Sequence, residues 1–121
     1  MADKDAVDAY FARLTGHVSE IAHELSRRIG EIGPHLNVSI AHGHPCWKGN
    51  GRVVSVVAHG SHCNLQLWSG ARLAADFSRI EGTGKALRHV KVRRLDEIDE
   101  AIDDIIEAAI ELDGVDPVRV R

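Results

Sequence analysis

Six potential metal ligands lie within 22 residues in the middle of the sequence. They are His42, His44, Cys46, His59, His62 and Cys63. Imidazole and thiolate groups are good ligands for zinc, iron and other transition metals. Their spacing matches no standard zinc pattern, so a metal site would need the fold to bring the ligands together.

The two strand-like runs 52–59 and 62–68 decide how these ligands can face one another. They are joined by Gly60-Ser61, a two-residue link typical of a β-hairpin. Directly opposite residues share a face, and one face becomes entirely apolar: Ala58, Cys63, Val56, Leu65, Val54 and Leu67. The other face holds His59, His62, Val57, Asn64, Ser55, Gln66, Val53 and Trp68.

This register places His59 opposite His62 and turns Cys63 toward the core. The two imidazoles could chelate one ion, with a third ligand from residues 42–46 or from His89. The alternative is that they are ordinary polar residues at a hairpin tip.

A second candidate cation site lies near the C-terminus. Its carboxylates recur on neighbouring helical turns: Asp96, Asp99, Glu100, Asp103, Asp104 and Glu107. Clusters of this kind attract calcium and oxygen-ligated iron. Since surface carboxylates also serve solubility, a solvated acidic face is the favoured reading.

Anion binding has two candidate locations. Residues 81–85, Glu-Gly-Thr-Gly-Lys, could cradle an anion with backbone N–H groups, aided by Lys85 and Arg88. The alternative is a turn that needs glycine at positive φ. If residues 87–93 add a strand with Val90 and Val92 inward, the polar hairpin face also gains His89, Lys91 and Arg93. That face, with Asn64, Gln66 and Trp68, suits a small anionic ligand or a protein partner.

The elements that position these residues follow from periodicity. Apolar residues at three- and four-residue steps predict helices up to about Leu14 and over 17–32, with a stop at Gly33-Pro34. Alternation predicts a strand over 36–42, and residues 42–51 are expected to form a loop with a tight turn at Asn50-Gly51. Residues 70–76 should form a helical turn or loop. A C-terminal helix should bury a stripe of Leu95, Ile98, Ile102, Ile105, Ala109 and Leu112.

Helices at both ends with strands between them predict an α+β fold. We expect a two-layer sandwich in which an antiparallel sheet of four or five strands carries the N-terminal and C-terminal helices on one face. The other face is then open to solvent. The 121 residues, 44% of them hydrophobic, fit one domain over 1–121.

The composition also excludes several classes of protein. Two cysteines are too few for a disulfide framework, and there is no signal peptide or membrane-spanning stretch, so a cytoplasmic location is expected. Residues 1–94 carry 13 basic and 8 acidic residues, whereas residues 95–116 carry 10 acidic and no basic ones. With a pI near 6.2, the chain lacks the usual charge of a nucleic-acid-binding protein.

Three stretches resemble the YdhG-like family, a group of small bacterial domains of unknown function with a frataxin-like fold. They are Gly-Ala-Arg-Leu (70–73), Glu-Gly-Thr-Gly-Lys-Ala-Leu-Arg-His-Val-Lys-Val (81–92) and the acidic helix after them. The hairpin and the His-Pro-Cys-Trp segment before it are also similar. The chain departs from the family pattern at 74–80, where many relatives carry a Pro-Gly turn.

The resemblance implies a fold but no catalytic residues. Some relatives are described as iron chaperones by analogy with frataxin, which would use the acidic ridge at Asp103, Asp104 and Glu107. The favoured function is therefore a non-catalytic binding module for an anionic small molecule or a protein partner. The alternatives are a frataxin-like chaperone for iron or another divalent metal, and an enzyme whose site is not visible in the sequence.

Overall fold

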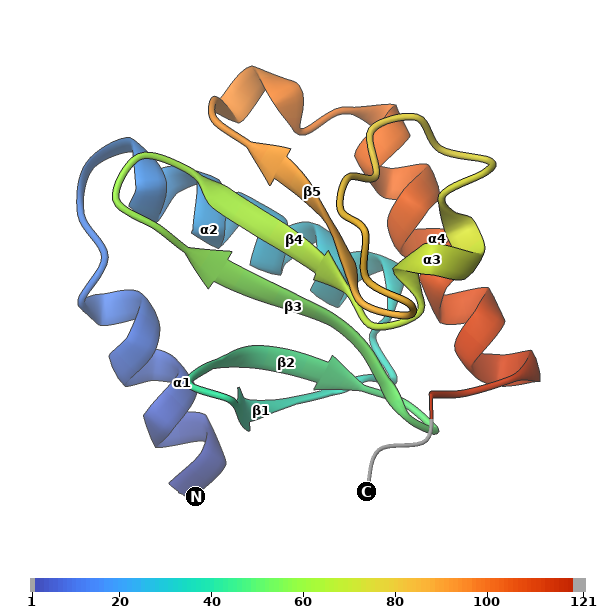
Figure 1. Cartoon of the computed structure of the whole chain (residues 1–121). Coiled ribbons are helices and arrows are strands. Elements are labelled where there is room, and N and C mark those ends of the chain that lie inside the picture. Colours follow the sequence, from blue (N-terminus) through green and yellow to red (C-terminus); the bar gives the residue numbers. More distant parts are fainter. Residues whose placement is uncertain (1, 119–121) are drawn as a thin grey trace.

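The computed structural model describes residues 2–118, and its N-terminal third is helical, as the apolar spacing predicts (Figure 1). Helix α1 spans Ala2–Ala12 and helix α2 spans Gly16–Ile32. The break falls at Thr15-Gly16, where Gly16 has a φ of 62° that favours glycine. Helix α2 buries the predicted stripe, including Ile21, Leu25 and Ile29.

Five antiparallel strands follow in an order that matches their order in the sequence. They are β1 (Asn37–Ala41), β2 (His44–Lys48), β3 (Arg52–Ala58), β4 (Cys63–Leu67) and β5 (Arg88–Val92). The β3–β4 hairpin has the predicted register, from Ala58 opposite Cys63 to Val54 opposite Leu67. Strand β5 pairs with β4. The prediction that 87–93 joins the sheet is therefore confirmed.

The expectation of a loop over 42–51 is wrong for half of that segment. Residues 44–48 form β2, which pairs with β1 on one side and with β3 on the other. The true loop is the two-residue turn His42-Gly43, with φ angles of 54° and 85°, as in the primed turns that join hairpin strands. Of the predicted loop, the tight turn at Asn50-Gly51 is confirmed, because it lies between the paired residues Lys48 and Arg52.

The C-terminal helix begins later than expected. Helix α4 spans Glu100–Val115, and Asp99 caps it by accepting from the N–H groups of Ala101 and Ile102. Leu95 belongs to a separate 3₁₀ helix, η1 (Leu95–Glu97), and is 48% exposed rather than buried. The short helix α3 (Gly70–Leu73) forms within the predicted 70–76 segment.

The core lies between the apolar face of the sheet and the helices. Fully buried residues of the sheet meet fully buried residues of α2 and α4: Val54, Val56, Leu65, Leu67, Val90, Val92, Ile21, Leu25, Ile29, Ile102, Ile105 and Ile106. Each large apolar side chain buried in this way contributes about 1.5–3 kcal/mol.

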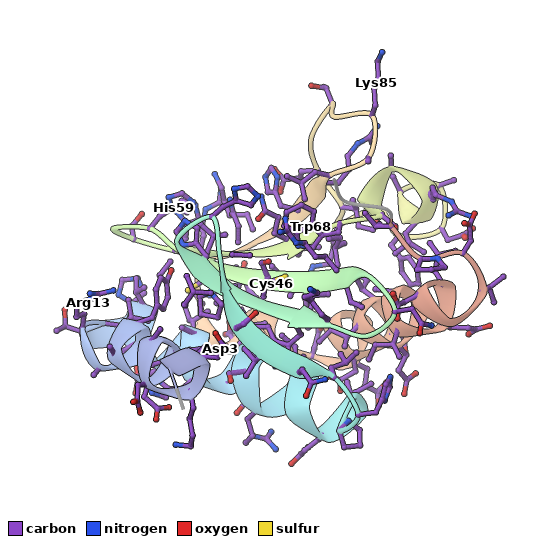
Figure 2. All side chains as sticks on the ribbon, turned by 90° about the horizontal axis from the view of Figure 1, so that it is seen from below. Asp3, Arg13, Cys46, His59, Trp68 and Lys85 are labelled. Atoms are coloured by element: carbon purple, nitrogen blue, oxygen red, sulfur yellow. The ribbon has the colours of Figure 1, made fainter. Side chains whose placement is uncertain are left out.

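The predicted fold class is confirmed. The fold is α+β, with an open five-stranded antiparallel sheet and with the N-terminal and C-terminal helices lying together on one of its sides (Figures 1 and 2). None of the described helices is both long enough and apolar enough to cross a bilayer.

Candidate functional site

The side of the sheet opposite the helices carries the polar half of the hairpin, with His59 and Trp68 projecting from it (Figure 2). The Gly60-Ser61 link is closed by a hydrogen bond from the N–H of His59 to the carbonyl oxygen of His62, at 2.8 Å. The two imidazoles stack with ring centroids 4.7 Å apart. Cys63 is fully buried, so its predicted inward orientation is confirmed.

Strand β5 extends this polar surface with positive side chains. Lys91 lies opposite Asn64 and His89 lies opposite Gln66, so each pair shares a face as predicted. The pKa of His62 is lowered, first by partial burial and then by the charges of His59, Lys91, Arg93 and His89. These groups therefore lie close together. We call His59, His62, His89, Lys91 and Arg93 the cationic patch.

Carboxylates are missing from the strands that build this face. None of the five strands in the described chain contains an Asp or a Glu. Glu81, which bridges to His89 at the sheet edge, is the one carboxylate that the pairing brings next to the cationic patch. Within residues 2–118, Lys91 and Arg93 form no ion pair. Their side chains are therefore not ion-paired in the described chain, and the Glu97 carboxylate accepts from the backbone N–H of Arg93 rather than from its guanidinium.

Trp68 is held in place by three neighbours. Its indole Nε1–H donates to Ser55 Oγ at 3.0 Å, the Arg52 guanidinium lies 4.9 Å from the ring centroid, and the His42 ring lies at 6.0 Å. Arg52 also donates from Nη1 to Nε2 of His42 at 3.1 Å. The charge of Arg52 is thereby fixed above an aromatic surface, a favourable cation–π arrangement.

A small pocket of about 180 Å³ opens beside this tryptophan. Its walls come from β1, the β1–β2 turn, β2, β3, β4 and the residue before β5: Ala41, His42, His44, Val57, Gln66, Trp68 and Leu87. The sequence analysis singled out Trp68 and Gln66 for ligand binding but missed His42 and His44 in this role. The alternation of apolar and polar residues on both sides of His42-Gly43 was the signal that could have placed them.

Tyr10 of α1 supports the pocket from the helical side. Its hydroxyl accepts a hydrogen bond from the N–H of Ala58 at 3.0 Å and lies 2.9 Å from Nδ1 of His44. Strand β2 has no pairing with β3 beyond Cys46, so the hydroxyl satisfies a donor that the sheet leaves open. The pKa of His44 is lowered by burial and, to a lesser extent, by the charge of His59.

One expectation about this face needs correction, and two residues of the proposed anion cradle lie away from it. The face is not uniformly open, because Val53 and Ser55 are only 3% and 1% exposed where Trp68 lies over them. Arg88 does not share the face of His89, since it is in register with Leu67, and its Nε donates to the carbonyl oxygen of Gly84. Lys85 sits on a loop that projects away from the sheet (Figure 2).

Within residues 81–85, Gly82 has the positive φ that the alternative to an anion cradle requires. Gly82 has a φ of 112°, which few other residues tolerate. The Arg88 guanidinium braces this loop through Gly84. A role of Lys85 and Arg88 in anion binding stays a prediction.

The metal sites stay predictions as well. In the described part of the chain, no three His, Cys, Asp or Glu side chains come together around a possible ion. Stacked imidazoles hold their ring nitrogens in nearly parallel planes, so His59 and His62 would have to rotate to share a metal.

The acidic ridge on α4 is partly used by an ion pair. Asp103 is paired with Arg28 at 3.0 Å, while Asp104 and Glu107 are exposed. Burial raises the pKa of the Cys63 thiol to about 11, which disfavours the thiolate that metals need.

A larger groove, of about 930 Å³, lies on the helical side between α1, α2 and β1. Its walls include Val7, Phe11, Leu36 and Val38, and Asp3 and Lys4 belong to its rim. The sequence analysis did not predict it, because it depends on the angle at which α1 leaves α2.

The fold is similar to that of a solved structure. A solved structure, YdhG of the DUF1801 family from Bacillus subtilis, matches with a TM-score of 0.70, and the match covers 93% of this chain and 90% of that one. The two sequences are 16% identical, so the match shows the fold alone. It confirms the predicted resemblance to YdhG at that level. No family model matches the sequence. No curated protein matches it either.

Proposed function

We propose that this chain is a non-catalytic binding module that holds a small anionic molecule on the face of the sheet opposite the helices. The observation that carries the proposal is the distribution of charge. The five strands contain no Asp or Glu, and β5 with the β3–β4 link places Lys91 and the histidines of the cationic patch together. Unneutralised cations on a partly buried surface attract anions, and the attraction weakens with salt.

The neighbourhood of His62 supports the same proposal. Burial lowers the pKa of His62 most, and four positive or protonatable neighbours, His59, Lys91, Arg93 and His89, lower it further. A bound anion would remove this repulsion and would accept charge-assisted hydrogen bonds from the same side chains. The patch is therefore electrostatically unfavourable when empty and favourable when an anion occupies it.

Calorimetric titration with sodium pyrophosphate at low ionic strength tests the proposal. We expect saturable binding that is weakened about tenfold or more in the Lys91→Gln/Arg93→Gln variant, because each lost charged hydrogen bond is worth about 1.5–3 kcal/mol. The matched control is Lys4→Gln/Arg27→Gln, which removes one lysine from α1 and one arginine from α2, both on the helical side of the sheet.

The control variant should bind within about twofold of the wild type, since both side chains lie on helices on the other side of the sheet and are already paired with carboxylates. Equal weakening in both variants would mean that only net charge matters. That result, or no binding to the wild type, would refute the proposal.

A further inference from the structure

The pocket beside Trp68 has a polar lining made almost entirely of hydrogen-bond donors, and this restricts what it can hold. The assignment starts with His42. Arginine can only donate, so the 3.1 Å contact between Arg52 Nη1 and His42 makes Nε2 of His42 the acceptor. In the neutral imidazole the proton is then on Nδ1, which becomes a donor.

His44 is assigned from the hydroxyl of Tyr10. This hydroxyl already accepts from the N–H of Ala58, and we assign its one proton to Nδ1 of His44, the acceptor 2.9 Å away. Nδ1 is thus an acceptor, and the proton of the neutral ring is on Nε2. His44 therefore also offers a donor to a ligand, and Tyr10 holds its ring in that orientation.

Positive charge lies at the rim of the pocket. Arg52 contacts both His42 and Trp68, two residues of the lining, and has no carboxylate partner within residues 2–118. Its planar guanidinium presents several N–H groups, and only one of them is used by His42. The amide of Gln66 is the one group in the lining that can also accept.

The rest of the lining is flat and apolar. The Trp68 ring, Val57 and Leu87 form it, and the pocket volume is about 180 Å³. A cavity of about 150 Å³ in another protein holds benzene, so this space fits one six-membered ring and a small substituent. A ligand that matches both the apolar walls and the hydrogen-bond donors has one aromatic ring and one planar group. That group carries negative charge and only accepts hydrogen bonds.

We infer that this pocket binds a small aromatic or heteroaromatic carboxylate, with its ring against Trp68 and Leu87 and its carboxylate on Arg52 and the two imidazole N–H groups. The inference rests on the proposed anion-binding function and names a ligand class for one part of the same face. It uses residues that the cationic patch does not contain.

The test follows the indole N–H signal of Trp68 by nitrogen–proton NMR during titrations with benzoate, benzamide and inorganic phosphate. A Trp68→Phe variant assigns the signal. Benzoate should shift this signal saturably and should bind about tenfold or more tightly than benzamide, which has the same shape and no charge. Inorganic phosphate should leave the indole signal in place. Equal affinity for benzoate and benzamide, or benzoate shifts confined to the cationic patch, would overturn the inference.

Variants of Arg52 separate charge from structure. Arg52→Gln should remove the preference for benzoate over benzamide, and Arg52→Lys should keep part of it. The control Arg27→Gln on α2 should leave it intact. Unchanged preference in Arg52→Gln would overturn the inference. If pyrophosphate binds but benzoate has no effect on the Trp68 signal, only this inference is refuted. If benzoate binds at Trp68 but pyrophosphate does not bind, only the proposed function of the cationic patch is refuted.

Discussion

The hydroxyl of Tyr10 is the single atom that joins α1 to both β2 and β3. It accepts from the Ala58 N–H, contacts His44, and belongs to a side chain that is 8% exposed. These contacts connect residues 34 and 48 positions apart. Periodicity identifies Tyr10 only as a helical residue, since the partner of a hydroxyl depends on how separate elements pack.

Replacing Tyr10 with phenylalanine should therefore destabilise the protein. The substitution leaves a backbone N–H without an acceptor in a partly buried position, which costs about 1–3 kcal/mol. Urea unfolding followed by circular dichroism measures the change. The exposed Lys4→Gln variant, expected within about 0.5 kcal/mol of the wild type, is the control. A Tyr10→Phe protein as stable as that control would show that the hydroxyl is not needed.

The two histidines with lowered pKa values make stability depend on pH in a defined direction. His44 and His62 are harder to protonate in the folded protein than in the unfolded chain, where the pKa is about 6.5. Their contribution to stability is therefore complete above about pH 6.5 and is lost as the pH falls through their lower folded pKa values. The lowered pKa values of Glu24, Glu97 and Asp99 act only in the more acidic range, below about 4.5.

Urea unfolding at a series of pH values between 7 and 5 checks this. The free energy of unfolding should decrease over that range in the wild type and decrease less in a His44→Gln variant. A His35→Gln variant, which changes an exposed histidine, should follow the wild type. A wild-type stability that rises as the pH falls would contradict the assignment.

At the scale of the elements, the end of α4 fastens the turn between β2 and β3. The carboxylate of Asp113 accepts from the N–H groups of Asn50 and Gly51, both at 2.8 Å, and the Asn50 side chain donates to the Asp113 carbonyl oxygen at 3.2 Å. Asp113 is 7% exposed. A β-carbon on Gly49 would lie 2.3 Å from this carboxylate, so glycine is required there.

Asp113→Ala should cost about 3 kcal/mol, because two hydrogen bonds to a charged acceptor are lost and two backbone donors are left without partners. Asp113→Asn should cost less, since one carbonyl oxygen remains. Asp104→Ala, at an exposed position of the same helix, should change stability by no more than about 0.5 kcal/mol. Thermal unfolding can rank the three variants, and equal effects of Asp113→Ala and Asp104→Ala would show that the turn is held by other contacts.

The elements also show where sequence reasoning succeeds and where it stops. The hairpin register was predictable, because a shift by one residue would have moved Val54, Val56 and Leu65 out of the core. Strand β2 was not, because His-Gly-His-Pro resembles a loop, and its pairing with two neighbours is a property of the sheet. The faces of Asn64 and Lys91 followed from alternation. The gathering of His42, Arg52 and Trp68 did not, since it needs a turn whose type the sequence left open.

At the scale of the whole molecule, the two layers carry different charge. The ten acidic residues of 95–116 belong to η1, α4 and their flanking residues, while the strands carry none. Layered charge of this kind orients the protein toward an anion and repels it from the helical side. The net charge of −3 therefore hides an uneven distribution, with strands that carry no carboxylate, which supports the proposed function.

The most direct test of this account is a map of backbone amide shifts in nitrogen-15-labelled protein during titration with sodium pyrophosphate at constant ionic strength. The account predicts saturable shifts at the tips of β3, β4 and β5, around His59, His62 and Lys91, with little change in α1, α2 and α4. Shifts confined to the helices, or none at saturating anion, would contradict it.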